Sequence, residues 1–298
     1  MKDVPHKRHG PDWYSESLVG QYISPNACPP LPPSATTELV TRGRLHGVLV
    51  DGCPDTGSCV NIVSYDFVRR QKWNFQPHSD LPHIQLPGRG TVRPLGTITL
   101  PWRFEGEERA YDIIFHVLAK CVHPVILGRK FLASSGSLGQ FFSRMKRKII
   151  SITTGRKNRL FLLDSPRERG VGSWGKLNGH AACALADTGS DVMVISLDFA
   201  KSLNLDIETD SWRREWLELA DGSITRTKGI VRGVEWTFGD ENVKYRCDFV
   251  VLDNIEYEVI LSNDFLFENR IFQTQDLFSS EQDDMIEAHQ RTLLIMKR

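Results

Sequence analysis

The sequence predicts an all-β protein that folds into two tandem β-barrel lobes with a few short helices. The first observation is an internal repeat, because DTGSCVNIVSYDFVRR at 55–70 matches DTGSDVMVISLDFAKS at 187–202, an offset of 132 residues. The second is the pattern inside each repeat. Runs such as TITLPWRF and GIVRGVEWTF are β-branched or alternating and are bounded by Gly, Pro and Asp, which is typical of short antiparallel strands.

Three further blocks repeat in the same order with nearly the same spacing. They are GRLHG at 43–47 with GKLNG at 175–179, LPGRGTVRPLG at 86–96 with LADGSITRTKG at 219–229, and VILGRKFL at 125–132 with VILSNDFL at 259–266. Their offsets are 132, 133 and 134 residues. Four ordered blocks with so little drift indicate that one structural unit occurs twice.

Helical patterns are confined to short segments. SYDFVRRQ and SLDFAKSL follow the two DTGS motifs and begin with the N-cap candidates Ser64 and Ser196. GRKFLASS and NDFLFEN show the same apolar spacing. We therefore expect one or two short helices in each lobe.

The sequence divides into four predicted segments. Residues 1–36 are rich in Pro and Ser and are expected to be disordered. Residues 37–165 form the first lobe and 166–278 the second. Residues 279–298 begin with a capping box and end with basic residues, so we expect a helix that packs on its own barrel or docks a partner.

Composition restricts the class of protein. The 37 basic and 37 acidic residues balance, so no overall field attracts nucleic acid or an anionic membrane. The six cysteines lack the spacing of a zinc site, and we expect no metal and no cofactor. Neither a signal peptide nor a membrane span is recognisable, which predicts a cytoplasmic or nuclear protein.

A basic segment, RMKRKIISITTGRKNRL at 144–160, has two interpretations. Its charges protect a solvated hairpin edge from aggregation, or they form a patch for nucleic acid or an acidic partner. We favour the hairpin edge and expect no nucleic-acid partner.

The duplicated DTGS motif carries the chemistry. Hydrolysis of a peptide without a metal or a covalent nucleophile needs one carboxylate to take a proton from water and one carboxylic acid to polarise the carbonyl. Two lobes that each supply one aspartate provide this pair. Gly57 and Gly189 permit close approach of the two loops, and Ser58 and Ser190 are expected to hydrogen-bond the neighbouring carboxylates.

The series of an apolar strand, Asp-Thr-Gly-Ser, a glycine-bearing hairpin and Ile-Leu-Gly before a short helix resembles the retropepsin-like aspartic proteases of retroviruses, retrotransposons and their cellular relatives. The resemblance covers about 37–165 and 170–275 and implies an intramolecular pseudo-dimer of two retropepsin-like lobes. It implies that Asp55 and Asp187 are the catalytic pair. It further implies an active-site loop in each lobe, comprising Thr56, Gly57, Ser58, Thr188, Gly189 and Ser190, whose threonine hydroxyls lock the loops together.

The same resemblance implies two hairpin flaps, near 86–93 and 219–226, that close over an extended peptide or protein substrate. The flap residues expected to contact it are Gly88, Gly90, Asp221 and Gly222. The resemblance also suggests that KIISIT and RLFLL are the closing strands of the first barrel.

Two residues depart from the family pattern. Pro54 precedes Asp55 and lacks a backbone N–H, and Ser262 stands where the first copy has Gly128. The expected function is therefore an aspartic endopeptidase, with a silent pseudoenzyme that binds peptides or assists assembly as the alternative. We expect a monomer whose lobes pair internally, with a homodimer as the other arrangement.

Overall fold

The computed structural model describes residues 35–151, 157–163, 172–239 and 243–274. The expected C-terminal helix at 279–298 and all but the last two residues of the expected disordered segment 1–36 lie outside these ranges. Within them, no helix is long and apolar enough to span a membrane.

The first lobe is a six-stranded barrel. Its sheet runs in the order β10-β1-β2-β9-β3-β8-β7-β4, and an additional pairing of β1 with β7 closes the ring. The ring strands are β1 (Ala35–Leu45), β2 (Val48–Asp55), β9 (Val125–Gly128), β3 (Asn61–Ser64), β8 (Ala110–Leu118) and β7 (Gly96–Phe104), with β10 (Met145–Ser151) and β4 (Gln76–Pro77) added outside it.

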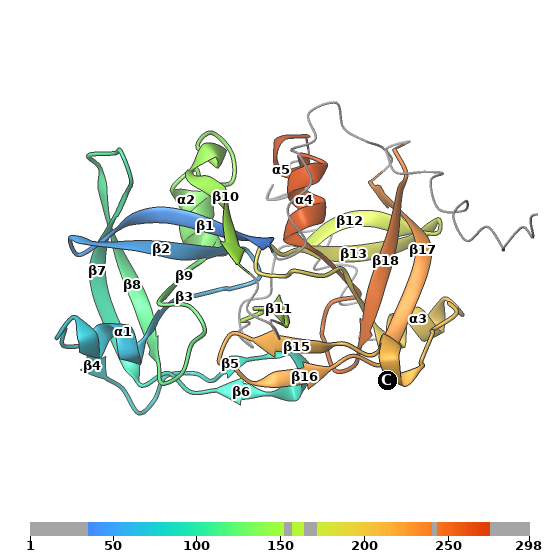
Figure 1. Ribbon diagram of the computed structural model, residues 1–298, viewed down its shortest axis with the longest axis horizontal. Coiled ribbons are helices and arrows are strands. Elements are labelled where there is room, and N and C mark those ends of the chain that lie inside the picture. The colour runs from blue at the N-terminus through green and yellow to red at the C-terminus, as the bar shows by residue number, and fades with distance from the viewer. Residues whose placement is uncertain (1–34, 152–156, 164–171, 240–242, 275–298) are drawn as a thin grey trace, which may run out of the picture.

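The second lobe closes in the same way. Its strands, in barrel order, are β12 (Gly172–Leu177), β13 (His180–Ala186), β19 (Val259–Leu261), β14 (Val194–Ser196), β18 (Tyr245–Leu252) and β17 (Gly229–Phe238). Each strand occupies the position of its repeat counterpart in the first ring. The prediction of two β-barrel lobes is confirmed, and Figure 1 shows the barrels side by side.

Small strands lie between the barrels. One hairpin pairs β5 (Ile84–Gln85) with β6 (Thr91–Val92), and another pairs β15 (Trp216–Leu219) with β16 (Ile224–Arg226). A fifth strand, β11 (Asn158–Leu160), runs parallel to β15. In Figure 1 the two hairpins lie low between the barrels, with β11 above them.

The helices are short and follow the repeat. They are α1 (Tyr65–Arg70), α2 (Arg129–Ser134), α3 (Leu197–Ser202), α4 (Asn263–Glu268) and α5 (Ile271–Thr274), with 3₁₀ turns η1 (Pro87–Arg89), η2 (Phe142–Arg144) and η3 (Ser211–Arg213). The hydroxyl of Ser64 accepts a hydrogen bond from the N–H of Phe67, and that of Ser196 accepts one from Phe199. These N-caps begin α1 and α3 at the predicted residues.

Each barrel core contains the same aromatic arrangement. In the first lobe, Phe104 meets Trp102 and Tyr111 edge-on and stacks on Phe131. In the second lobe the repeat equivalents Trp236, Phe238, Tyr245 and Phe265 make the same three contacts. The duplication therefore extends from the motifs to the packing.

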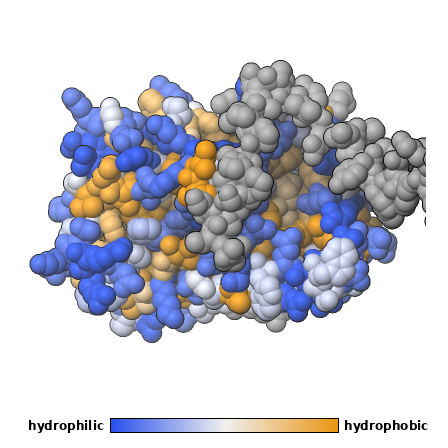
Figure 2. All heavy atoms as spheres, in the orientation of Figure 1, coloured by the Kyte–Doolittle hydropathy of each residue, from blue (hydrophilic) through white to orange (hydrophobic). Residues whose placement is uncertain are grey.

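The lobes also contact each other through helical and strand segments. Phe142 packs against Phe267 and Phe272 of the second lobe. Arg147 on β10 pairs with Asp264 on α4 at 2.9 Å. Figure 2 shows hydrophobic residues in several patches among hydrophilic ones on the visible face of the molecule.

Two sequence-based expectations are wrong. Residues 148–151 of KIISIT belong to β10, which pairs with β1 outside the ring, and residues 159–160 of RLFLL belong to β11, which pairs with the second lobe. The β pattern was correct, but a pattern of residues does not specify the partner strand.

The basic segment is bonded to acidic residues. Arg144 forms two hydrogen bonds of 2.6 Å with the carboxylate of Glu107, and Lys148 bonds Asp51 at 2.7 Å. β10 is an outer strand of the first-lobe sheet, so its charges lie along a sheet edge. The described residues do not form the expected hairpin, because β10 pairs with β1 and β11 pairs with β15.

Replacing Gly43 by Ala should destabilise the first barrel by about 1–3 kcal/mol. A Cβ at Gly43 would lie 2.4 Å from Cζ2 of the buried Trp102 and 2.7 Å from the carbonyl oxygen of Arg103. Gly139→Ala is the control, because a Cβ there meets nothing within 4 Å. Chemical denaturation measures both variants, and equal midpoints would contradict the packing argument.

Candidate active site

Two equivalent loops bring the two aspartates to the centre of the molecule. Asp55 is the last residue of β2, which runs parallel to β9, and Asp187 directly follows β13, which runs parallel to β19. The N–H of Asp187 donates to the carbonyl of Leu261 at 3.0 Å. Both aspartates are fully buried.

Reciprocal threonine hydrogen bonds join the loops. The Thr56 N–H donates to Oγ1 of Thr188, and the Thr188 N–H donates to Oγ1 of Thr56, both at 2.9 Å. Each hydroxyl then donates across the interface, Thr56 to the carbonyl of Ala186 at 2.6 Å and Thr188 to that of Pro54 at 2.9 Å. Every donor and acceptor of this buried network is therefore satisfied.

The glycines face the opposite carboxyl groups. A Cβ on Gly57 would lie 2.6 Å from Cγ of Asp187, and one on Gly189 would lie 2.6 Å from Oδ1 of Asp55. No side chain larger than hydrogen fits at either position. Each lobe thus presents a bare backbone to the carboxyl group of the other.

The serines do not orient the carboxylates, which corrects the expectation for Ser58 and Ser190. Each hydroxyl instead donates to the carbonyl two residues further on, Ser58 to Val60 and Ser190 to Val192, both at 2.7 Å. A short polar side chain readily makes this local bond to its own backbone. The serines therefore stabilise the shape of the loops.

The two carboxyl groups differ electrostatically. Burial, followed by the charge of Asp187, raises the pKa of Asp55 well above its usual value. Burial also raises the pKa of Asp187, to about 6, but here hydrogen bonds from the Gly189 N–H and from Asp55 oppose the shift. The Gly189 N–H lies 2.8 Å from Oδ1 of Asp187. The pair is therefore arranged to share one proton.

Arg129 adds to this asymmetry and is absent from our sequence-based site. It is 6% exposed, its Nη1 donates to the carbonyl of Thr56 at 3.2 Å, and its charge lowers the pKa of Asp187. Its repeat equivalent is the neutral Asn263. The sequence could have indicated Arg129, because the repeated block VILGRKFL and VILSNDFL has a charged residue at this position in only one copy.

Pro54 is accommodated without loss of a strand hydrogen bond. The β1–β2 register ends at the pair Thr41 and Gly52, two residues before Pro54. The Pro54 carbonyl accepts from Thr188 of the other lobe, so this residue directs its polar backbone away from β9. The N–H that proline lacks would point to the same side as this carbonyl, away from β9, so the β2–β9 ladder loses no hydrogen bond.

Ser262 is also accommodated, as a helix cap. It is 4% exposed, and its hydroxyl accepts from the N–H of Phe265 at 3.4 Å at the start of α4. In the first copy, a Cβ at Gly128 would lie 2.5 Å from the carbonyl oxygen of Val60. The two copies therefore differ in local packing, and each residue fits its own site.

The predicted flap residues lie at the turns of the two small hairpins. Gly88 and Gly222 adopt left-handed φ values of 77° and 80°, which glycine accepts without strain. Asp221 fixes its turn by accepting from the N–H and the hydroxyl of Ser223 at 2.9 and 2.6 Å. A Cβ at Gly88 would lie 3.5 Å from Oγ1 of Thr225, so the hairpins meet.

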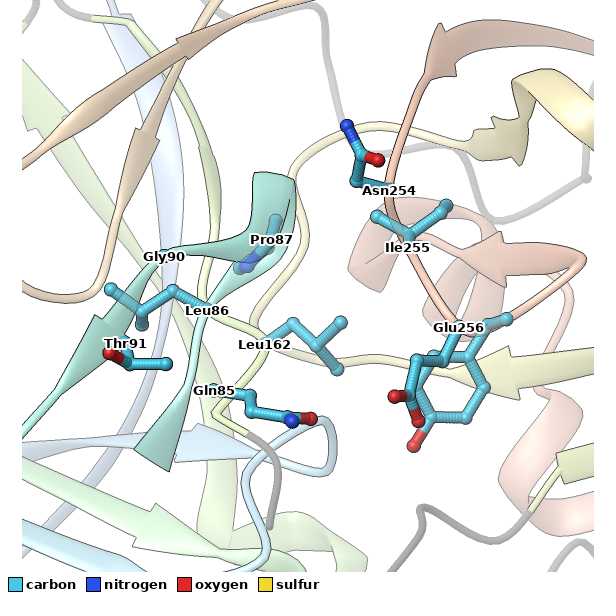
Figure 3. Close-up of a pocket in the computed structure, with 10 residues that line it drawn as sticks. Gln85, Leu86, Pro87, Gly90, Thr91, Leu162, Asn254, Ile255 and Glu256 are labelled. Carbon is cyan, nitrogen blue, oxygen red and sulfur yellow. The ribbon is translucent and has the colours of Figure 1, made fainter. Parts of the chain in front are cut away.

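Gly90 accepts from the N–H of Leu86 through its carbonyl at 2.8 Å and lines a cavity of about 180 Å³. The cavity wall includes Leu86 and Thr91 of the first hairpin, Tyr257 of the second lobe, and Leu162. Figure 3 shows Leu162 between the first hairpin and the loop at 254–257. In the described ranges, no group of three His, Cys, Asp or Glu side chains is arranged to hold a metal ion.

Stability should fall as the pH rises through about 6. The unfolded chain releases the aspartate protons near pH 4, whereas the folded pair retains them because both pKa values are raised. With about 1.4 kcal/mol for each pKa unit, the loss is a few kcal/mol. Denaturation from pH 4 to 7 measures it. Asp187→Asn should flatten this dependence, and an unchanged slope in that variant would contradict the assignment.

Comparison with known proteins finds a similar family and similar solved structures. Residues 174–268 match the family model described as gag-polyprotein putative aspartyl protease. Among solved structures, the retroviral protease-like domain of Ddi1 from Leishmania major is 18% identical, with 33% of this chain and 74% of that chain covered and a TM-score of 0.26. No curated protein sequence matches significantly. Residues 174–268, in the second lobe, thus match the retropepsin-like aspartyl protease family.

Proposed function

We propose that this protein is an aspartic endopeptidase in which Asp55 and Asp187 form the catalytic pair. The observation that carries the proposal is a pair of fully buried carboxyl groups on equivalent loops, with raised and unequal pKa values. Burying two carboxyl groups side by side costs stability. A chain that keeps both, with matched glycines to make room for them, is arranged for chemistry that needs them.

In the proposed reaction, Asp187 is the general base and Asp55 the general acid. Asp187 takes a proton from water as the water oxygen attacks the peptide carbonyl carbon, and Asp55 donates its proton to the carbonyl oxygen. The lower pKa of Asp187, supported by the Gly189 N–H, favours this assignment. Collapse of the tetrahedral intermediate then breaks the C–N bond and returns a proton to the amine.

The proposed substrate is an extended peptide or protein segment. The DTGS loops and an edge of the second hairpin pair with extended chain, as they do with residues 158–163, so an extended peptide can bind there as an added strand. The apolar cavity beside Leu86 and Tyr257 suits a hydrophobic side chain next to the cleaved bond. The reaction needs no cofactor, and one chain supplies both aspartates.

Replacing either aspartate by Asn should reduce peptide cleavage by roughly 100- to 10,000-fold, because each variant removes one proton-transfer step. The assay measures cleavage of a mixture of peptides by mass spectrometry. The control is Asp248→Asn, on the exposed face of the second barrel. Asp191→Asn would not serve, because it would weaken the bond between Asp191 and Arg159 beside the second active-site loop. Equal rates in all variants would exclude the aspartic mechanism. No cleavage by the wild type would favour the alternative, a silent pseudoenzyme that binds peptides or assists assembly.

Pro54→Ala should leave the cleavage rate within about threefold of wild type, because the ring nitrogen replaces no hydrogen bond of the strand ladder. The Pro54 carbonyl, which holds Thr188, is retained in this variant. The same peptide assay gives the comparison. Thr188→Val removes the hydroxyl at the other end of that bond and should cause a much larger loss. A rise in activity for Pro54→Ala would mean that proline displaces Asp55.

A further inference from the structure

The segment Asn158–Leu163 lies extended between the two DTGS loops and bonds the second one. The N–H of Asp191 donates to the carbonyl of Arg159 at 2.9 Å, and the N–H of Arg159 donates to Oδ2 of Asp191 at 3.0 Å. The N–H of Phe161 donates to the carbonyl of Gly189 at 3.3 Å. This half of the segment is therefore attached beside Asp187 by backbone bonds.

The other half of the segment bonds the first loop. The N–H of Cys59 donates to the carbonyl of Leu163 at 3.0 Å, and Ser58 forms a β-bridge with Leu163. On the second loop the matching bridge joins Ser190 to Leu160. One short stretch of chain thus spans both active-site loops.

The repeat locates the centre of this stretch. Cys59 and Asp191 are equivalent residues of the two copies, and they hold the carbonyls of Leu163 and Arg159. The carbonyl midway between these two is that of Phe161. Ser58 and Ser190 are also equivalent, and the midpoint of their partners Leu163 and Leu160 is the bond between residues 161 and 162. Both comparisons centre the segment on the peptide bond Phe161–Leu162.

This bond therefore lies at the local two-fold axis that relates the loops, and Asp55 and Asp187 lie on either side of the same axis. Burial agrees, because Leu160 and Leu163 are fully buried, Phe161 is 1% exposed and Leu162 is 5% exposed. The two carboxyl groups are fully buried as well.

The side chains of the segment have fitted sites on both sides of the bond. Leu162 enters the cavity formed with Leu86 and Tyr257 (Figure 3). Phe161 packs edge-on against His123 with ring centroids 5.3 Å apart. The guanidinium of Arg159 is 8% exposed and bonds the carboxylates of Glu38 and Asp191.

The second hairpin completes the enclosure. β11 adds to it as a parallel strand, with Asn158 opposite Leu217 and Leu160 opposite Leu219. The amide of Asn158 also donates to the Glu215 carboxylate at 2.9 Å. An extended chain that pairs with a hairpin edge while its side chains fill pockets is bound in the manner of a peptide ligand.

We propose that Asn158–Leu163 is an internal substrate and that the protein cleaves its own chain between Phe161 and Leu162. The proposal rests on the proposed endopeptidase function and names the first substrate of that site. Until it is cut, the segment occupies the groove that a foreign peptide would need.

The step is a hydrolysis and needs only water. The water oxygen bonds to the carbonyl carbon of Phe161 while Asp187 takes the water proton, and Asp55 protonates the carbonyl oxygen. The bond from this carbon to the nitrogen of Leu162 then breaks as Asp187 gives its proton to the nitrogen, and a hydroxyl of the intermediate returns a proton to Asp55. The products are a chain ending in the carboxylate of Phe161 and a chain beginning with the amine of Leu162.

The experiment incubates the purified full chain near pH 6 and follows intact mass and N-terminal sequence. We expect a new N-terminus at Leu162, a fragment ending at Phe161, and a rate independent of protein concentration. Asp187→Asn should stay intact, also when mixed with the wild type, because cleavage is intramolecular.

Variants of the segment test its role. Phe161→Asp places a charge in an apolar site and should slow self-cleavage at least about tenfold, whereas Lys157→Asp, an exposed position just outside the segment, should not. Phe161→Leu keeps the site apolar and should retain cleavage. Circular dichroism melting shows whether each variant is folded.

A peptide mixture added in trans to the wild type and to Phe161→Asp separates the two proposals. Peptides cut by either protein while the wild-type chain stays intact would overturn self-cleavage and leave the endopeptidase function standing. An intact chain with no peptide cut by either protein would overturn both. Cleavage of the chain at another bond, or equal rates for Phe161→Asp and Lys157→Asp, would overturn the assignment of this segment.

Discussion

The reciprocal bonds between Thr56 and Thr188 are the constraint on which the active site depends. They fix the two loops at the one place where both lobes contribute equivalent backbone, and every buried polar group there is satisfied. Only then do Gly57 and Gly189 lie against the opposite carboxyl groups. Loss of one hydroxyl would leave buried groups without partners in both lobes, so the lobes and the site are stabilised together.

An almost symmetric fold produces two unequal carboxyl groups. The aromatic cores and the threonine bonds repeat, whereas the residues around the loops do not, since Arg129 corresponds to Asn263 and Pro54 to Ala186. The Gly189 N–H and the charge of Arg129 favour ionised Asp187, whereas Asp55 faces burial and the charge of its neighbour. The sequence differences between the two copies therefore help to give the two aspartates different roles, one as acid and one as base.

Most of the fold was predictable because duplication makes weak motifs informative. The matched offsets predicted two equivalent barrels, and the DTGS motifs located both loops. Two features were not predictable. The hydroxyls of Ser58 and Ser190 had a carboxylate and a local carbonyl within reach of a short side chain, and sequence does not choose between them. The partner of RLFLL was also missed, because a short apolar run suits any sheet edge.

The groove between the lobes has a symmetry that a bound peptide lacks. Two identical lobes offer a groove with two-fold symmetry, but any peptide that fills it has a direction, so it cannot match both halves equally. The connection between the lobes occurs once, and it runs from Arg159 beside Asp187 to Leu163 beside Cys59. It thereby gives the groove a direction, with the ion-pair site of Arg159 at one end and the cavity for Leu162 past the centre. The segment that joins the lobes is consequently also the segment best positioned to bind between them as a substrate.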